Sequence, residues 1–281
     1  MTFGELYYRE YAPHARLAPF VRAYFTFDSS SAALGRALRK FIVFRDASAA
    51  CPALFADAAC SLVIKHGTWS VDGLSATDMH AAVIGPQTSG RTTRVGSDVS
   101  AVGAYFRIGA LGDFSNIPTV LLVDEALSLC DAFDGEVRSA AESICEASDS
   151  TGRLDTLERL LMQLLRSAPR RSRSSMDSMR VSEIATNRFS IDRLAKRYGV
   201  SRQYLTRRFR ERFGIAPKLL SRIARFHGVL RSLPEQAPNW AELAFEHGYT
   251  DQSHLIAEFR EFTTLTPATF IAAQRAHPFA A

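Results

Sequence analysis

The spacing of apolar residues divides the chain into a strand-rich front part and a helical back part. From about Tyr8 to Phe106, short apolar or alternating runs are separated by Gly, Ser, Asp and Pro, as in FVRAYFTF, CSLVIKHG, HAAVIG and VSAVGAYFRI. Runs of this length between turn residues favour antiparallel strands. The front part therefore predicts an antiparallel β-sheet or a small barrel.

Helical patterns follow the strands, near Ala110 to Phe114, Ala132 to Ala147 and Leu154 to Arg166. Strands first and helices later predict an α+β domain over residues 1–166. The last of these helices has an apolar seam that repeats in steps of three and four: Leu154, Leu157, Leu161 and Leu164. This seam either packs on its own domain or pairs with a second copy in a homodimer, because the spacing fits a coiled coil but lasts less than two heptads.

The back part, residues 179–281, contains a helix-turn-helix pattern. A helix is expected from Ile191 to Tyr198 and a second from Arg202 to Phe213, with serines at positions 190 and 201 as their N-caps. Gly199 permits a tight corner between them, where the backbone needs a positive φ. Two capped helices joined at a glycine are typical of a helix-turn-helix.

The same arrangement recurs about fifty residues later. Helices are expected from Trp240 to Glu246 and from Gln252 to Thr263, with Gly248 at the corner and Thr250 or Asp251 as the N-cap. A helix from Lys218 to Leu233 joins the two units. The spacing from alanine to the corner glycine is the same in both units. The back part is therefore predicted to be all-α, with two tandem helix-turn-helix units.

The second helix of each unit carries polar side chains opposite its buried positions. In the first unit these candidates for contacting DNA are Arg202, Gln203, Thr206, Arg207 and Arg210. Arg suits guanine, Gln suits adenine, and Thr can meet a thymine methyl group in the major groove. Arg208 and Arg212, with Arg210, are expected at phosphates, which give affinity without sequence information. In the less basic second unit the candidates are Gln252, Ser253, Ile256 and Ala257.

Charge supports this division of the chain. Residues 1–165 hold 14 Lys and Arg against 19 Asp and Glu, whereas residues 181–281 hold 15 against 9. Between them, residues 167–178 form a linker rich in Arg, Ser and Pro. Double-stranded DNA is thus the expected partner of the back part alone. The chain shows no signal peptide or membrane span, so a cytoplasmic protein without membrane contact is expected.

The back part resembles the DNA-binding domain of the AraC/XylS family of bacterial transcription regulators. The stretches that carry the resemblance are SRQYLTRRFRERFGIAP, Arg225 in the joining helix, and LAFEHGYTDQSHLIAEFREFTTLTP. The resemblance implies two recognition helices in successive major grooves. It places base contacts at Gln203, Thr206 and Arg207, and again at Gln252, Ser253, Ile256 and Ala257. Family members often carry Arg where this chain has Ala257, and Gly where it has Thr264, so specificity is expected to rest more on the first unit.

The front part also resembles the sensory domain of one AraC-type subgroup, through LFADAACSLVIKHG, VIGPQTSG and VGAYFRIGALGDF. Where that subgroup has Pro-Asp-Gly, this chain has Ala56-Asp57-Ala58-Ala59. An unidentified small-molecule effector is expected to bind there, with Trp69, Tyr105 and Arg107 as candidate contacts. RNA polymerase is a further candidate partner.

Other functions have weaker support in the sequence. The histidines at positions 14, 66 and 80 lack the spacing of a metal site, and no phosphate loop or nucleophile elbow occurs. No cofactor, metal or catalytic residue is therefore expected, and an enzyme of the metal-dependent cupin type is the unfavoured alternative. The four cysteines are expected to be reduced and packed as apolar groups rather than to sense metal or redox state. A second alternative is DNA binding without sequence preference or effector.

Overall fold

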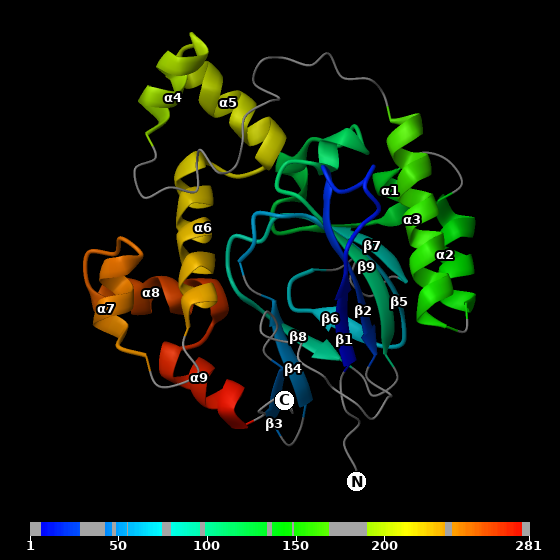
Figure 1. Cartoon of the computed structure of the whole chain (residues 1–281), viewed down its shortest axis with the longest axis horizontal. Helices are drawn as coiled ribbons and strands as arrows, with labels where there is room; N and C mark the ends of the chain where they lie inside the picture. Colours follow the sequence, from blue (N-terminus) through cyan, green and yellow to red (C-terminus); the bar gives the residue numbers. More distant parts are fainter. Residues whose placement is uncertain are drawn as a thin grey trace.

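The structure is a computed structural model that describes residues 7–28, 43–46, 49–54, 56–74, 80–95, 99–133, 137–147, 149–168, 190–233 and 238–276. Nearly all of the predicted linker, from residue 169 onward, lies outside the described residues. The N-terminal domain combines strands with a few helices, and helices alone follow in the C-terminal domain (Figure 1). The predicted fold class is confirmed.

The strands form two antiparallel sheets. Their bounds are β1 (Tyr7–Tyr11), β2 (Val21–Asp28), β3 (Val43–Asp46), β4 (Ala49–Leu54), β5 (Ser61–His66), β6 (Trp69–Val71), β7 (Ala81–Ile84), β8 (Arg91–Val95), β9 (Ser100–Phe106) and β10 (Ala126–Ser128). The larger sheet has the order β1-β2-β9-β5-β7-β10 and the smaller one β3-β4-β8-β6. The central strand β9 alternates its side chains between two cores, since Val102 and Ala104 face one side while Ala101 and Tyr105 face the other.

Helices cover one face of the larger sheet. They are α1 (Leu129–Ala132), α2 (Val137–Glu146) and α3 (Ser150–Ser167), and two short 3-10 helices precede them, η3 (Leu111–Asp113) and η4 (Thr119–Leu122). The core under α1–α3 includes Leu62, Val83 and Phe106 from the sheet. On the opposite face, Phe25, Phe27 and Val63 pack against Val71 of the smaller sheet. The N-terminal domain therefore has a helical layer, a central sheet and a second sheet (Figure 1).

The leucine seam of α3 belongs to the domain's own core. Leu157 and Leu161 have no exposed surface, Leu164 is buried, and the half-buried Leu154 packs on the same cluster. Three of the four leucines are thus covered within one chain and leave little apolar surface for a partner. The structure therefore favours the alternative, packing within the domain, and the homodimer contact through these leucines stays a prediction.

The first five C-terminal helices match their predicted bounds to within one residue, and the sixth was not predicted from the sequence. The helices are α4 (Ile191–Tyr198), α5 (Arg202–Phe213), α6 (Pro217–Ser232), α7 (Trp240–Glu246), α8 (Gln252–Thr263) and α9 (Pro267–Ala276). The N-cap side chains of Ser190, Ser201 and Asp251 accept hydrogen bonds from backbone amides three residues later. Asp251, rather than Thr250, caps α8.

Both corners have the same backbone geometry. Gly199 and Gly248 have φ of +65° and +72°, in the region that glycine adopts without steric cost. After each corner the next amide returns to the alanine of the preceding helix, from Val200 to Ala195 at 3.0 Å and from Tyr249 to Ala244 at 2.8 Å. The repeat inferred from sequence is thus a repeat of structure.

The N-terminal domain contacts the ends of both second helices. The backbone amides of Ala56 and Gly90 donate to the carbonyl oxygens of Phe262 and Glu261, each at 3.0 Å. These carbonyls belong to the last turn of α8, where carbonyl groups find no amide donors within their own helix. Thus the N-terminal domain supplies part of the cap of α8. Near the end of α5, Thr119 of η4 lies against Gly214.

Candidate nucleic-acid interface

The outward face of α5 is open to solvent. Leu205, Phe209 and Phe213 point into the core, and they leave the opposite side of the helix to polar residues. On that side the side chains of Arg202, Gln203, Arg207 and Arg210 are exposed and Thr206 is half-buried. Helix α5 therefore presents the predicted contact residues together, on one face of one helix.

The arginines of this face have weak local partners. Arg207 lies 3.9 Å from Glu211 and Arg202 lies 3.5 Å from Asp192, and both arginine side chains are more than three-fifths exposed. Exposed ion pairs of this kind contribute about 0–1 kcal/mol. Their guanidinium groups can therefore exchange these partners for a base or a phosphate at little cost. Thr206 differs, because its hydroxyl already donates to the carbonyl of Arg202 at 2.9 Å.

Two other arginines predicted at phosphates are more constrained. Arg208 donates to Glu211 at 2.8 Å, and its side chain is only 37% exposed. Arg212 lies over the ring of Phe213 at 5.4 Å. Phosphate contact by either residue would require these local contacts to change, so Arg210 is the better placed of the three.

The outward face of α8 is smaller and less charged. Gln252, Ser253 and Ala257 are exposed and Ile256 is half-buried. Leu255 and Phe259 anchor the opposite side in the core. Helix α8 thus offers one amide, one hydroxyl and two apolar groups, without a cation among the four predicted contact residues.

An open hollow of about 560 Å³ borders the contact face of α5. Its walls are Val120, Arg202, Gln203, Thr206, Arg207, Arg210 and Glu211. Val120 comes from η4 of the N-terminal domain and is 44% exposed. The sequence pattern gave no sign of this neighbour, because η4 is a single short turn without periodicity.

Two of the three candidate effector residues lie in one place. Trp69 and Tyr105 both pack against the core between the two sheets, next to Phe27 and Phe25 respectively. The indole N–H of Trp69 is buried without a hydrogen-bond acceptor among the described residues. Arg107 is placed differently, since it is exposed and its Nε donates to the carbonyl of Ala18 at 2.7 Å. The structure therefore groups Trp69 with Tyr105 and gives Arg107 a structural contact.

The cysteines of the N-terminal domain occupy separate environments. Cys60 is buried in the core, and this burial, with the nearby Asp57, raises the pKa of its thiol to about 12. Cys130 is exposed and Cys145 is half-buried. Within the described ranges, no group of three His, Cys, Asp or Glu side chains is arranged to hold a metal ion. No described helix has the length and apolar character needed to cross a membrane.

Comparison with protein families gives an independent assignment. Residues 194–273, which include both corners and both outward faces, match the family model described as a helix-turn-helix domain, of AraC type. Residues 194–273 therefore form a helix-turn-helix domain of the AraC type, the kind found in DNA-binding transcription regulators. In this regulator, residues 9–128 match a second model, described as a domain of unknown function (DUF6597). None of the curated proteins matches the sequence.

Solved structures resemble the regulator only distantly. ToxT from Vibrio cholerae O395 is 10% identical over 83% of this chain and 97% of that chain, with a TM-score of 0.44. Unsaturated fatty acid bound wild-type ToxT from Vibrio cholerae strain SCE256 is 10% identical over 96% of this chain and 95% of that chain, with a TM-score of 0.43. The DNA-binding domain of AdpA, in complex with a target DNA, is 28% identical over 36% of this chain and 90% of that chain, with a TM-score of 0.32. Scores below 0.5 are too low to assign a ligand or mechanism.

Proposed function

We propose that this regulator reads a specific sequence in double-stranded DNA through the outward faces of α5 and α8. The observation that supports this most directly is the repeat. The second helix of each repeated unit carries an exposed face with polar side chains, while its opposite side is buried in the core. An α-helix fits into the major groove of DNA, and the side chains near its N-terminus then meet base edges.

The two units are proposed to contribute unequally. The face of α5 offers three exposed arginines and a glutamine, Arg202, Arg207, Arg210 and Gln203, whereas that of α8 offers Gln252 and Ser253 as its polar groups. Paired hydrogen bonds from Arg to guanine and from Gln to adenine are the commonest specific contacts in the major groove. We therefore assign most of the specificity to α5 and a supporting role to α8.

Control by the N-terminal domain is the second part of the proposal. A small molecule is proposed to bind between the two sheets, near Trp69 and Tyr105, where aromatic rings and one indole donor converge. The contacts of Ala56 and Gly90 with the last turn of α8 offer a direct path from that domain to a recognition helix. We place the domain division at residues 167–178. Homodimerisation and contact with RNA polymerase stay predictions.

The base-reading role of Arg207 is tested by selecting bound sequences from randomised duplexes. Wild-type protein should enrich one motif. Arg207→Ala should lower affinity for that motif by about 1–3 kcal/mol and relax the preference at one base pair. Arg193→Ala is the matched control, because it removes another exposed arginine, from α4, and should weaken binding to all sequences alike. Equal weakening on every duplex by Arg207→Ala would refute base reading by this residue.

The same selection separates the proposal from binding without sequence preference. A non-specific binder would enrich no motif and would show affinity that falls steeply with salt for every duplex. A specific regulator should retain a preference for its motif at each salt concentration.

A further inference from the structure

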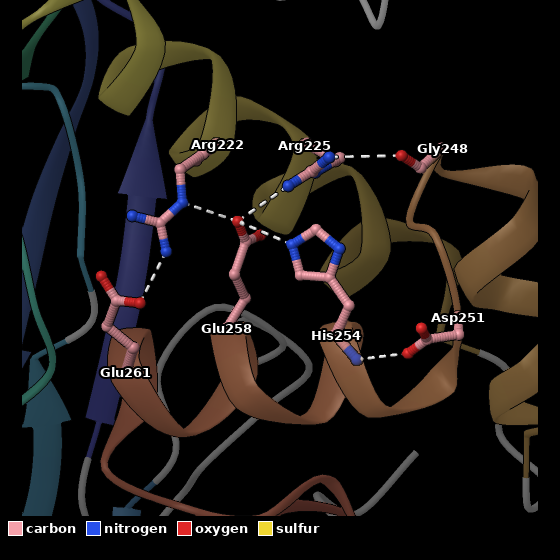
Figure 2. Close-up of polar contacts among 7 residues, drawn as sticks. All are labelled: Arg222, Arg225, Gly248, Asp251, His254, Glu258 and Glu261. Atoms are coloured by element: carbon pink, nitrogen blue, oxygen red, sulfur yellow. Dashed lines mark hydrogen bonds and ion pairs between the residues drawn. The ribbon is translucent and has the colours of Figure 1, made fainter.

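A buried carboxylate on the inner side of α8 joins that helix to α6. Glu258 is only 2% exposed, and one of its oxygens, Oε1, accepts hydrogen bonds from Arg222 Nε and Arg225 Nη2, each at 2.7 Å. Arg222 also donates to Glu261 at 2.6 Å (Figure 2). Two cations and two anions thus balance one another along the contact between the helices. We refer to Arg222, Arg225, Glu258 and Glu261 as the α6–α8 charge cluster.

The α6–α8 charge cluster also holds the corner of the second unit. Arg225 donates through Nη1 to the carbonyl of Gly248 at 3.2 Å, and its guanidinium lies over the ring of Tyr249 at 4.1 Å. The two terminal nitrogens of Arg225 therefore bond the carbonyl of Gly248 at the corner and the carboxylate of Glu258 on α8 (Figure 2). A planar guanidinium can do this because its donors diverge at fixed angles, which an ammonium group cannot reproduce.

The first turn of α8 places a histidine near the same carboxylate. His254 Nε2 lies 3.8 Å from Oε1 of Glu258, and its ring meets that of Tyr249 edge to face at 5.3 Å. His254 follows directly after Gln252 and Ser253, the polar residues of the outward face. Movement of the cluster would therefore move the side chains proposed to meet DNA.

The first unit lacks this arrangement at the matching positions. Val200 stands where the second unit has Tyr249, and Arg208 stands where it has Glu258, with Leu205 and Phe209 aligned to Leu255 and Phe259. Arg208 pairs instead with Glu211 of its own helix near the surface. Packing of apolar side chains thus orients α5, whereas a buried ionic contact contributes to the orientation of α8.

Burial makes the geometry of this contact restrictive. A buried charge is tolerated only while its partners stay within hydrogen-bond distance, so few orientations of α8 against α6 keep Oε1 of Glu258 close to both arginines. Burial acts to lower the pKa of Arg222, but the hydrogen bonds that it donates to Glu261 and Glu258, together with the charge of both carboxylates, outweigh burial and raise that pKa above its ordinary value. Arg222 therefore remains a cation in this contact.

We propose that Glu258 and Arg225 are positioning residues for DNA recognition, which fix the angle of α8 and so determine the base preference of the second half of the binding site. Neither residue lies on the outward face. The inference rests on the proposed function, because it requires that α8 meets base edges.

The test is a base-by-base comparison of variants on the motif selected by the full-length wild-type chain. Gln203→Ala and Gln252→Ala first identify the base pairs read by α5 and by α8. Glu258→Gln, which keeps the shape of the side chain but removes its charge, should then reduce discrimination at the α8 base pairs about tenfold and leave the α5 base pairs unchanged. Arg225→Lys keeps the charge but loses the fork, and should give the same pattern; it also serves if Glu258→Gln does not fold.

Glu261→Gln is the matched control, since the Glu261 side chain is 46% exposed and, among the described residues, bonds one terminal nitrogen of Arg222, Nη2. It should leave discrimination at both sets of base pairs unchanged. Full discrimination by Glu258→Gln and Arg225→Lys at the α8 base pairs would overturn the proposal, as would an equal loss in both halves, which indicates general destabilisation. If Gln203→Ala and Gln252→Ala map no base pairs, the proposed function itself fails, which is a different outcome.

Discussion

Thr264 ends α8 in a backbone conformation that glycine adopts more easily. Its φ is +67°, in the left-handed region, where a β-branched side chain is strained. The matching residue after α5 is Gly214, with φ of +80°. The threonine that departs from the AraC pattern therefore keeps the positive φ of the glycine.

Replacing Thr264 by glycine should stabilise the protein. Relief of the left-handed strain, less the extra entropy of glycine in the unfolded chain, gives an expected gain of about 1 kcal/mol. Thermal unfolding measures it, with the exposed Thr250→Gly as a control that should give no gain. A lower melting temperature for Thr264→Gly than for wild type would contradict the strain argument.

His247, at the corner of the second unit, should make stability depend on pH. Burial lowers its pKa below the ordinary value, with Arg231 acting in the same direction and Glu246 opposing. As the pH falls, His247 takes up its proton more readily in the unfolded state than in the folded state. The folded state therefore keeps its full stability above about pH 6.5 and loses stability as the pH falls below that value. His247→Gln should reduce the fall in melting temperature between neutral and mildly acidic pH. If the melting temperature of His247→Gln fell with pH as steeply as that of wild type, His247 would not be a source of the pH dependence.

At the scale of elements, α3 shows that an apolar stripe can be predicted correctly while the surface that packs against it is not. The spacing of its leucines predicts an apolar stripe, but periodicity does not say which surface covers the stripe. The structure covers it with the domain's own sheet and α2. Leu161→Ala should therefore destabilise the fold by about 2–5 kcal/mol without changing the molecular mass in solution.

Chemical denaturation and light scattering check the Leu161 prediction together. The exposed Arg159→Ala on the same helix is the control and should change stability by less than about 0.5 kcal/mol. A loss of dimer with unchanged stability would restore the homodimer contact that the fold argues against.

The elements that the sequence predicts well are those with local signals. Helices α4, α5, α7 and α8 follow their predicted bounds because N-caps, corner glycines and apolar periodicity all lie within a few residues of each end. In contrast, η4 and β10 are short and lack periodicity. The candidate contact residues on α5 could be chosen from the pattern alone, whereas Val120 and the Glu258 contact depend on tertiary structure and could not.

At the scale of the whole molecule, the two domains share one interface at the ends of the recognition helices. Ala56 and Ala58 are buried in the same cluster as Phe209 and Phe259. His227 Nε2 of α6 lies 2.8 Å from the carbonyl oxygen of Ala56. The segment in which the chain departs from the Pro-Asp-Gly of related sensory domains is thus part of the contact between domains, a role that no local signal announces.

Gly90→Ala should disrupt this interface. A Cβ at position 90 would lie 2.6 Å from the carbonyl carbon of Thr263 and 2.8 Å from the amide nitrogen of Thr264, both backbone atoms. The expected result is a more extended protein by small-angle scattering and a loss of about 1–3 kcal/mol of stability. Gly152→Ala, whose added Cβ would meet only the Asp149 side chain at 3.4 Å, is the control. Unchanged scattering and stability for Gly90→Ala would show that the domains do not depend on this contact.

The central claim is that two repeated helices read DNA together, and a substitution scan along the duplex selected by the wild-type chain tests it most directly. Each base pair is changed in turn and the binding affinity is measured at fixed salt. Two clusters of sensitive base pairs should appear about ten base pairs apart, the spacing of successive major grooves, and one base pair of the stronger cluster should lose its sensitivity in Arg207→Ala. A scan with no sensitive positions, or with one cluster only, would contradict the account.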